Sequence, residues 1–190
     1  MKKIRTVLAF CSLFPLVACG DPFTFKLASV GVIATMEGVF KDPEINLKEK
    51  NYAAADYMAT QLQRSNVSYG ANIHALPLVE MDNPSISSEF GLSVPEGIGL
   101  RLIELGYNVW LYDVAHGGNA GLYQEPPKGV SPDYKMVGRY AVKDRNVDVY
   151  IRVINTKTSQ VVAQFDYTMP LNSELRELSK TPVQIFRIEN

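Results

Sequence analysis

The sequence predicts an α+β fold in which two helices pack on a mixed sheet that ends in an antiparallel three-strand β-meander. Apolar and polar residues alternate from Val147 to Val153, which is typical of a strand with one buried face. A second run, Val161–Met169, is rich in β-branched and aromatic residues and follows a polar turn at 155–160. Val137–Val142 precedes the first run across a tight turn at 143–146. Such a meander cannot bury its apolar face alone, so we expect helices to cover it.

The first helix is expected over Asn46–Arg64, where strong helix formers place one apolar side at helical spacing. These residues are Ala53, Ala54, Ala55, Met58, Ala59 and Leu62. Asn46 or Asn51 is the expected N-cap, because an asparagine side chain accepts a hydrogen bond from an otherwise unpaired amide of the first turn.

The second helix is expected over Ser85–Leu105, with Ser87 or Ser88 as its N-cap. Pro95 is a difficulty, because a proline inside a helix lacks an N–H donor and costs about 3 kcal/mol. A split of the element, with Pro95 in the first turn of the main helix, would avoid this cost. Gly106 is expected to end the helix as the glycine that follows the C-cap.

Apolar runs on both sides of the second helix predict strands over Ala75–Met81 and Tyr107–Asp113. Pro77 removes one ladder donor, which favours an edge or a strand start at that point. Strand, helix and strand in this order predict a βαβ unit. The stretch Ala115–Lys135 is expected to be a loop, and loops of this length inside a domain are usually functional or mobile.

The N-terminus has the pattern of a bacterial lipoprotein signal peptide over residues 1–18. A basic start precedes the apolar run Val7–Val17, which is shorter than the roughly 20 residues of a membrane-spanning helix. Leu16–Cys19 resembles the lipobox, in which the cysteine is lipidated and becomes the new N-terminus. Cys19 is therefore the predicted lipidation site. Cys11 lies in the removed segment, so no internal disulfide is expected.

Residues 19–45 are expected to be the lipidated cysteine and a tether. Asp directly after the cysteine would favour retention in the inner membrane, but Gly20 stands there. The lipoprotein pattern therefore implies the periplasmic face of the outer membrane of a Gram-negative cell, with the membrane as a partner through acylated Cys19. Without its signal peptide the chain keeps 16 basic and 20 acidic residues, a net charge of −4. This balance argues against nucleic acid as the main partner.

Five motifs follow one another along the chain: Asn51–Asp56, Pro77–Asp82, Leu102–Val109, Gly138–Tyr140 and Ile154–Ala163. In this order they resemble the FlgO family of outer-membrane lipoproteins from flagellated Gram-negative bacteria. The resemblance implies an α/β domain over residues 46–170 and a C-terminal extension over residues 171–190. In the extension, Leu171–Leu178 is compatible with a helical turn or two and Val183–Ile188 with a strand.

The FlgO resemblance implies a non-enzymatic role at or near the flagellum, in which the protein anchors or assists a larger envelope assembly. A second hypothesis is an activator of a periplasmic cell-wall synthase, or a secretion component, because related α/β lipoprotein domains include both. A third is an esterase-like enzyme. Self-association is compatible with all three.

The esterase hypothesis depends on His116-Gly117-Gly118, which resembles an oxyanion loop, and on serines as nucleophiles. The candidate nucleophiles are Ser85, Ser87 and Ser88. No Gly-x-Ser-x-Gly motif follows a strand, and these residues stand in no recognisable catalytic order. The sequence therefore predicts no catalytic residue.

A metal or phosphate site would need ligands at characteristic spacings. The possible metal donors are His74, His116, Asp82 and Asp113, and none of their spacings is typical of a metal site. Gly91, Gly97 and Gly99 lack the Lys-Ser/Thr that ends a phosphate-binding loop. We expect Gly97 and Gly99 to let the helix approach the sheet instead. The sequence therefore predicts no metal and no cofactor.

Aromatic residues gather around the long loop and form either a binding surface or core with polar tips, of which the core is favoured. They are Tyr107, Trp110, Tyr112 and Tyr123. Arg139, Arg145 and Arg152 are expected on the solvated face of the meander. We expect the protein to act by binding, through Ala115–Lys135 and the neighbouring strand ends, because partners tend to sit beyond the carboxyl ends of strands.

Overall fold

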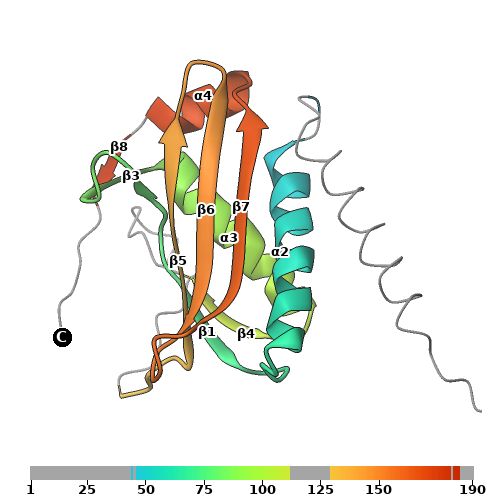
Figure 1. Cartoon of the computed structure of the whole chain (residues 1–190). Coiled ribbons are helices and arrows are strands. Elements are labelled where there is room, and N and C mark those ends of the chain that lie inside the picture. Colours follow the sequence, from blue (N-terminus) through green and yellow to red (C-terminus); the bar gives the residue numbers. More distant parts are fainter. Residues whose placement is uncertain (1–43, 45, 112–128, 181, 185–190) are drawn as a thin grey trace, which may run out of the picture. The chain divides into compact units, whose positions relative to one another are not determined.

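The structure is a computed structural model that describes residues 44, 46–111, 129–180 and, for the backbone alone, 182–184. The described residues form an α+β fold, as the sequence predicts, with the helices on one face of a mixed sheet (Figure 1). The helices are α2 (Leu47–Arg64), α3 (Glu89–Glu104) and α4 (Ser173–Lys180). The strands are β1 (Asn72–Ala75), β2 (Val79–Glu80), β3 (Ile86–Ser88), β4 (Asn108–Leu111), β5 (Tyr134–Val142), β6 (Asn146–Asn155), β7 (Val161–Pro170) and β8 (Pro182–Gln184).

The main sheet has the strand order β4-β1-β5-β6-β7. β1 is parallel to both β4 and β5, whereas β5, β6 and β7 are antiparallel. β1 precedes α3 in the sequence and β4 follows it, and the two strands pair in parallel. This pairing confirms the predicted βαβ unit. β3 and β8 form a separate antiparallel pair.

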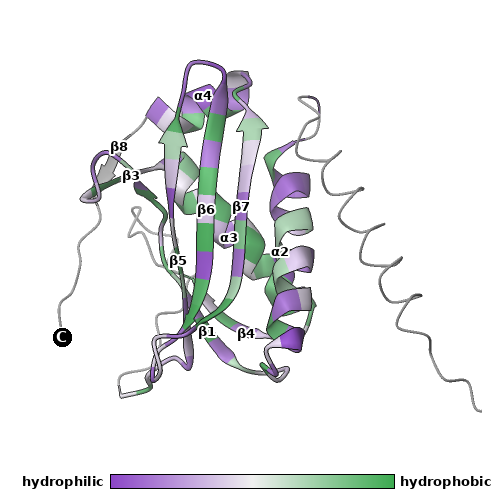
Figure 2. Ribbon diagram, viewed as in Figure 1, coloured by the Kyte–Doolittle hydropathy of each residue, from purple (hydrophilic) through white to green (hydrophobic). Residues whose placement is uncertain are grey.

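The predicted β-meander is confirmed, including its register. In β6, the side chains of Val147, Val149, Ile151 and Val153 are fully buried. Tyr150 and Arg152, between them, are half-buried on the opposite face. Figure 2 shows this alternation as bands of opposite hydropathy along β6. The loop predicted to end at Lys135 ends earlier, because β5 already begins at Tyr134.

The prediction of a single strand over Ala75–Met81 is wrong. The chain forms β1 and β2, both parallel to β5, and leaves the sheet between them. Leu76 N–H donates to Met136 O and Met81 N–H to Tyr140 O, so both flanks follow β5. In the gap, Leu78 N–H turns away and donates to Gly91 O in α3, at 2.8 Å. Pro77, which has no N–H, lies in this break.

Local capping residues end both long helices as predicted, but the predicted start of the second helix at Ser85 is wrong, because Ile86–Ser88 form β3. Asn46 Oδ1 accepts from Glu49 N–H at the start of α2, and Ser88 Oγ accepts from Gly91 N–H at the start of α3. At the end of α3, Gly106 has φ +95° and its N–H donates to Ile103 O. Tyr107 N–H donates to Leu102 O, which completes a Schellman motif.

Pro95 does not split the second helix, because α3 runs unbroken through it. The carbonyl that loses its intrahelical donor at Pro95 is that of Gly91, four residues earlier. Gly91 O accepts the N–H of Leu78 instead, so the break between β1 and β2 supplies the hydrogen bond that Pro95 removes. The proline is therefore accommodated by a tertiary contact.

α2 and α3 bury one face of the sheet, and α2 lies along the β7 edge (Figure 1). Buried residues of both helices share one core with the inner side chains of the sheet, among them Met58, Leu62, Val94, Ile98 and Leu102. A Cβ on Gly99 would lie 2.6 Å from Leu111 Cδ2, so Gly99 lets α3 approach β4 as predicted. Gly97 faces α2 instead, where a Cβ would lie 2.5 Å from Asn51 Nδ2.

The C-terminal extension contributes α4, which is shifted by two residues from the predicted Leu171–Leu178. β8 covers the beginning of the strand predicted over Val183–Ile188, and residues 185–190 lie outside the described part of the chain. Within the described residues, no helix is both long enough and apolar enough to cross a membrane.

Candidate functional site

Two of the three serines considered as nucleophiles, Ser87 and Ser88, make structural hydrogen bonds. Ser87 is buried, and its hydroxyl donates to Leu78 O at 2.6 Å. Ser88 is also buried; its Oγ caps α3 and accepts a hydrogen bond from the hydroxyl of Tyr140 at 2.9 Å. Burial raises the pKa of the Tyr140 hydroxyl above its ordinary value. Ser85 is exposed next to the turn that precedes β3.

The candidate metal donors are only partly placed by the structure. His74 is half-buried in β1 and Asp82 is exposed after β2, whereas His116 and Asp113 lie outside the described residues, as does Cys19. Among the residues that the structure describes, no three His, Cys, Asp or Glu side chains come together as metal ligands would. Gly91, Gly97 and Gly99 all lie within α3, where each allows a close contact.

The structure describes two of the four aromatic residues that the sequence places around the long loop. Tyr107 is almost fully buried and packs on Tyr69, with ring centroids 5.6 Å apart, as expected for core. Trp110 is half-buried in β4, at the register position of His74. Tyr112 and Tyr123, together with most of the predicted binding loop, fall outside the described residues.

The face of β5, β6 and β7 that points away from α2 and α3 is the surface that we call the outer face. Its side chains are those of Lys135, Val137, Arg139, Ala141, Asp148, Tyr150, Arg152, Ile154, Gln164, Asp166 and Thr168. No helix in the described part of the chain lies over it (Figure 1). The solvated position predicted for Arg139 and Arg152 is confirmed, whereas Arg145 lies in the β5–β6 turn.

A hollow of about 510 Å³ opens on the outer face. It is lined by Met81, Val137, Gly138, Arg139, Tyr150 and Arg152. The register pairs Val137 with Arg152 and Arg139 with Tyr150, so the two arginines occupy diagonal positions across β5 and β6. Met81 follows β2 and closes the hollow on the side of β5 that is opposite to β6. The site thus combines two cations with apolar side chains.

Two ion-paired groups flank the hollow. Arg152 binds the carboxylate of Asp166 on β7 through both terminal nitrogens, with 3.0 Å from Nη2 to Oδ2. Asp148 accepts from Thr168 Oγ1 at 2.6 Å and pairs with Lys143 in the β5–β6 turn. The Lys143 ammonium, followed by the Thr168 hydroxyl, lowers the pKa of the Asp148 carboxyl. Both aspartates of the outer face are therefore already neutralised.

Arg139 differs from the other charged residues around the hollow. It is exposed, and it makes no salt bridge or hydrogen bond through its side chain to the part of the chain that is described. Its neighbours are both structural: a Cβ on Gly138 would lie 2.3 Å from Tyr150 O, and Tyr140 is buried against Phe90. Unlike its two neighbours, Arg139 therefore has no structural role in the described part of the chain.

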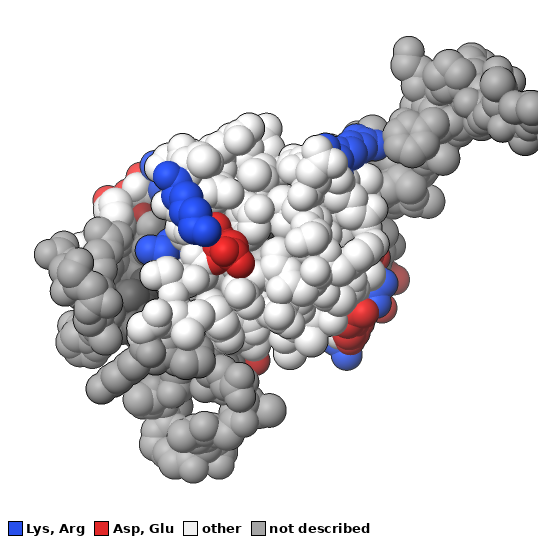
Figure 3. All heavy atoms as spheres, turned by 90° about the horizontal axis from the view of Figure 1, so that it is seen from below, with Lys and Arg blue, Asp and Glu red and all other residues white. Residues whose placement is uncertain are grey.

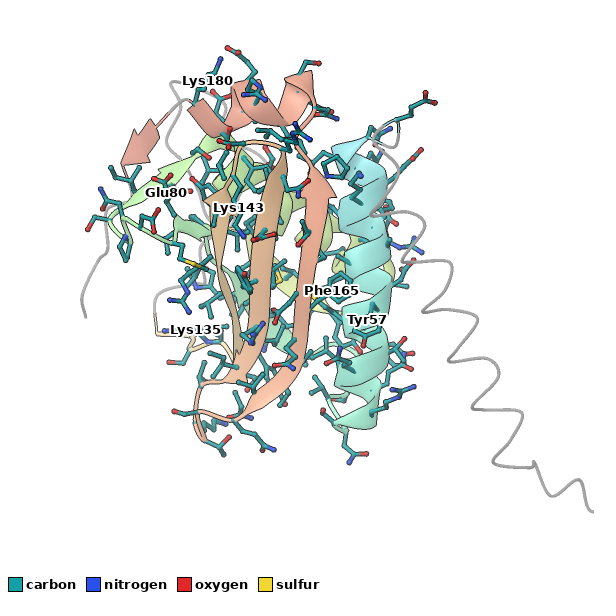
Figure 4. The ribbon with its side chains drawn as sticks, turned by 45° about the horizontal axis from the view of Figure 1, so that its top comes forward. Tyr57, Glu80, Lys135, Lys143, Phe165 and Lys180 are labelled. Carbon is teal, nitrogen blue, oxygen red and sulfur yellow. The ribbon has the colours of Figure 1, made fainter. Side chains whose placement is uncertain are left out.

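The edge of the sheet beside the outer face is occupied by α2. The Gln61 side chain donates to Gln164 O at 2.8 Å and accepts from Gln164 N–H at 3.0 Å, as a neighbouring strand would. Ser65 Oγ donates to Val162 O at 2.7 Å. Figure 4 shows Tyr57 of α2 and Phe165 of β7 facing each other, with ring centroids 4.8 Å apart. These contacts occupy the β7 edge, so a partner is not expected to add a strand there.

The end of the domain seen in Figure 3 carries few charges among the described residues, and mixed ones. An ion pair at this end joins Lys157 to Asp133 at 4.0 Å. Tyr69 is exposed there, but its hydroxyl accepts from Gln63 Nε2 at 2.6 Å. The described residues at this end form no basic cluster comparable to the outer face.

Sequence reasoning placed Arg139 and Arg152 on the outer face but missed the hollow and its lining by Met81 and Tyr150. The alternation in β6 contained the signal for Tyr150, because it assigns that side chain to the same face as Arg152. Met81 joins the site only through the pairing of β2 with β5, which the sequence does not indicate.

Comparison with known proteins bears out the FlgO resemblance over part of the chain. A family model described as FlgO protein matches residues 124–174, which include the whole meander. No curated protein matches the chain. The solved LpoB C-terminal domain from Escherichia coli is similar at 11% identity and a TM-score of 0.44, over 63% of this chain and 96% of that chain. The corresponding Salmonella enterica domain gives 9%, 0.39, 61% and 94%.

Proposed function

We propose, with the FlgO match over residues 124–174 as the premise, that this protein is a lipid-anchored, non-enzymatic component of the Gram-negative outer membrane. In this proposal it supports a larger cell-envelope assembly by binding one of its proteins. The observation that carries the proposal is how the polar side chains are used. Ser87 and Ser88 make hydrogen bonds within the fold, whereas Arg139 is exposed at the open hollow on the outer face. That arrangement favours recognition over chemistry.

The anchor is tested by Cys19→Ser, because acyl chains on the cysteine contribute about 0.8 kcal/mol per buried CH₂ to membrane binding. We expect the variant to leave the membrane fraction or to accumulate unprocessed, while the parent remains in the outer-membrane fraction after a high-salt wash. Unchanged membrane association of Cys19→Ser would contradict the anchor.

Two kinds of assembly are candidates for the partner. The flagellum is supported by the family match, and a cell-wall synthase or secretion component is the alternative that the sequence leaves open. Deletion of the gene separates them when swimming motility and incorporation of a fluorescent D-amino acid into the wall are measured side by side. Loss of motility with normal wall incorporation supports the flagellar role, and the reverse supports the synthase role. No change in either measurement would count against an envelope role.

The long loop offers a second test of action by binding. We expect deletion of Gly117–Gly129, bridged by a short linker, to leave folding intact and to abolish the envelope phenotype. The matched control is the double variant His74→Ala and His116→Ala, which removes both histidines of the chain and should keep the phenotype. Loss of function in this control, with normal folding and export, would support the catalytic or metal hypothesis instead.

A further inference from the structure

We infer that the hollow on the outer face is a docking site for an extended acidic segment of a partner protein, in which a carboxylate binds Arg139. This inference deepens the proposed function and depends on it. It names the chemistry of the contact, namely acidic side chains alternating with apolar ones.

The outer face has a positive charge that favours an acidic partner. This face carries the cations Lys135, Arg139 and Arg152, and its Asp148 pairs with Lys143 of the β5–β6 turn. Asp148 and Asp166 neutralise Lys143 and Arg152, which leaves Lys135 and Arg139 without an ion pair in the described structure. The whole chain has a formal net charge of −1, so this positive face is a local exception that attracts acidic partners.

The side chain of Arg139 has the geometry to bind a carboxylate. A guanidinium presents a planar fork of donors that matches both oxygens of a carboxylate. The neighbouring Arg152 already binds Asp166 in this way, so Arg139 is the cation of the hollow that remains to be paired. An incoming carboxylate on Arg139 would lie beside the hydroxyl-bearing ring of Tyr150, its register partner.

The lining of the hollow also favours a segment with apolar side chains. Met81, Val137 and the ring of Tyr150 give the hollow an apolar part next to its cations. An extended peptide places alternate side chains on one side, so acidic and apolar residues in alternation can reach Arg139 and the apolar part in turn.

The inference is tested with the full-length lipidated protein in neutral detergent micelles. The probe is a short peptide in which Glu and Val alternate, labelled with an uncharged dye and followed by fluorescence anisotropy. Matched peptides carry Gln or Lys in place of Glu. We expect the Glu peptide to bind, the other two to bind at least about tenfold more weakly, and binding to weaken as salt is added.

Two charge-matched variants locate the site. Arg139→Gln should weaken binding of the Glu peptide about tenfold or more, because it removes a charge-assisted hydrogen-bonding pair. Arg145→Gln removes the same charge from the exposed β5–β6 turn and should bind like the parent. Val137→Trp fills the hollow without changing any charge and should also weaken binding. Circular dichroism of each variant shows whether it is folded.

Several outcomes would overturn the inference. Equal weakening by Arg139→Gln and Arg145→Gln would mean attraction by net charge alone, and binding of anionic vesicles but not of the Glu peptide would assign the face to the membrane. In cells, full complementation by Arg139→Gln would refute the docking site and leave the proposed function standing. The proposed function is tested separately, by deletion of the whole gene, by Cys19→Ser and by the double histidine variant.

Discussion

Replacement of Gly91 by alanine probes the contact between α3 and the break between β1 and β2. Gly91 lies in the first turn of α3, where its carbonyl accepts from Leu78 N–H and its N–H donates to Ser88 Oγ. An alanine Cβ would lie 2.2 Å from Ser87 Oγ, 2.5 Å from Leu78 O and 3.0 Å from a ring carbon of Tyr140. Because Leu78 O is a backbone atom, it cannot move aside as the end of a side chain can.

The expected cost follows from three contributions. Overpacking of a close-packed site costs about 1–3 kcal/mol. Displacement of Ser87 leaves the buried Leu78 carbonyl without its 2.6 Å hydrogen bond, which costs about 1–3 kcal/mol. Alanine in place of glycine in a helix returns about 1 kcal/mol. The free energy of unfolding should therefore fall by about 3 kcal/mol in Gly91→Ala.

The assay is urea-induced unfolding of a form without residues 1–19, followed by far-ultraviolet circular dichroism. Ser87→Ala and the double variant complete a thermodynamic cycle. Removal of Ser87 Oγ takes away the shortest clash, so the double variant should lose less stability than the sum of the two single variants, by about 1 kcal/mol or more. Additive losses, or a Gly91→Ala variant as stable as the parent, would refute the steric account.

Three further predictions concern the sheet. Ile151→Asp places a charge at a fully buried position and should lower the free energy of unfolding by several kcal/mol, whereas Arg152→Asp, on the outer face, should cost about 1 kcal/mol; equal losses in urea unfolding would show a wrong register. Gln61→Ala removes both hydrogen bonds to the β7 edge and should cost about 1–2 kcal/mol and promote concentration-dependent association, seen by sedimentation; an unchanged monomer of equal stability would refute its protective role. Because Lys143 lowers the pKa of Asp148, the stability advantage of the parent over Asp148→Asn should be full above pH 3.8, the ordinary pKa of aspartate, and should shrink as the pH falls below it; a pH-independent difference would contradict the ion pair.

Elements whose signals are local could be predicted from the sequence. The alternation from Val147 to Val153 set the strand and its register, because a period of two assigns each side chain to one face. Asn46, Ser88 and Gly106 set helix ends, because a cap acts on amides and carbonyls within a few residues. The same alternation already placed Arg152 on the solvated face.

Features that join distant segments depend on how the chain packs and could not be predicted from the sequence. Pro95 is accommodated within α3 because Leu78, from the break between β1 and β2, donates to Gly91 O. Gln61 protects an edge that lies 103 residues away along the chain. The hollow likewise needs Met81 from β2 beside β5 and β6. The sequence indicates a missing hydrogen-bond donor, an exposed strand edge or an outward-pointing side chain. The packing of distant segments determines which group replaces that donor, covers that edge or joins that side chain in a site.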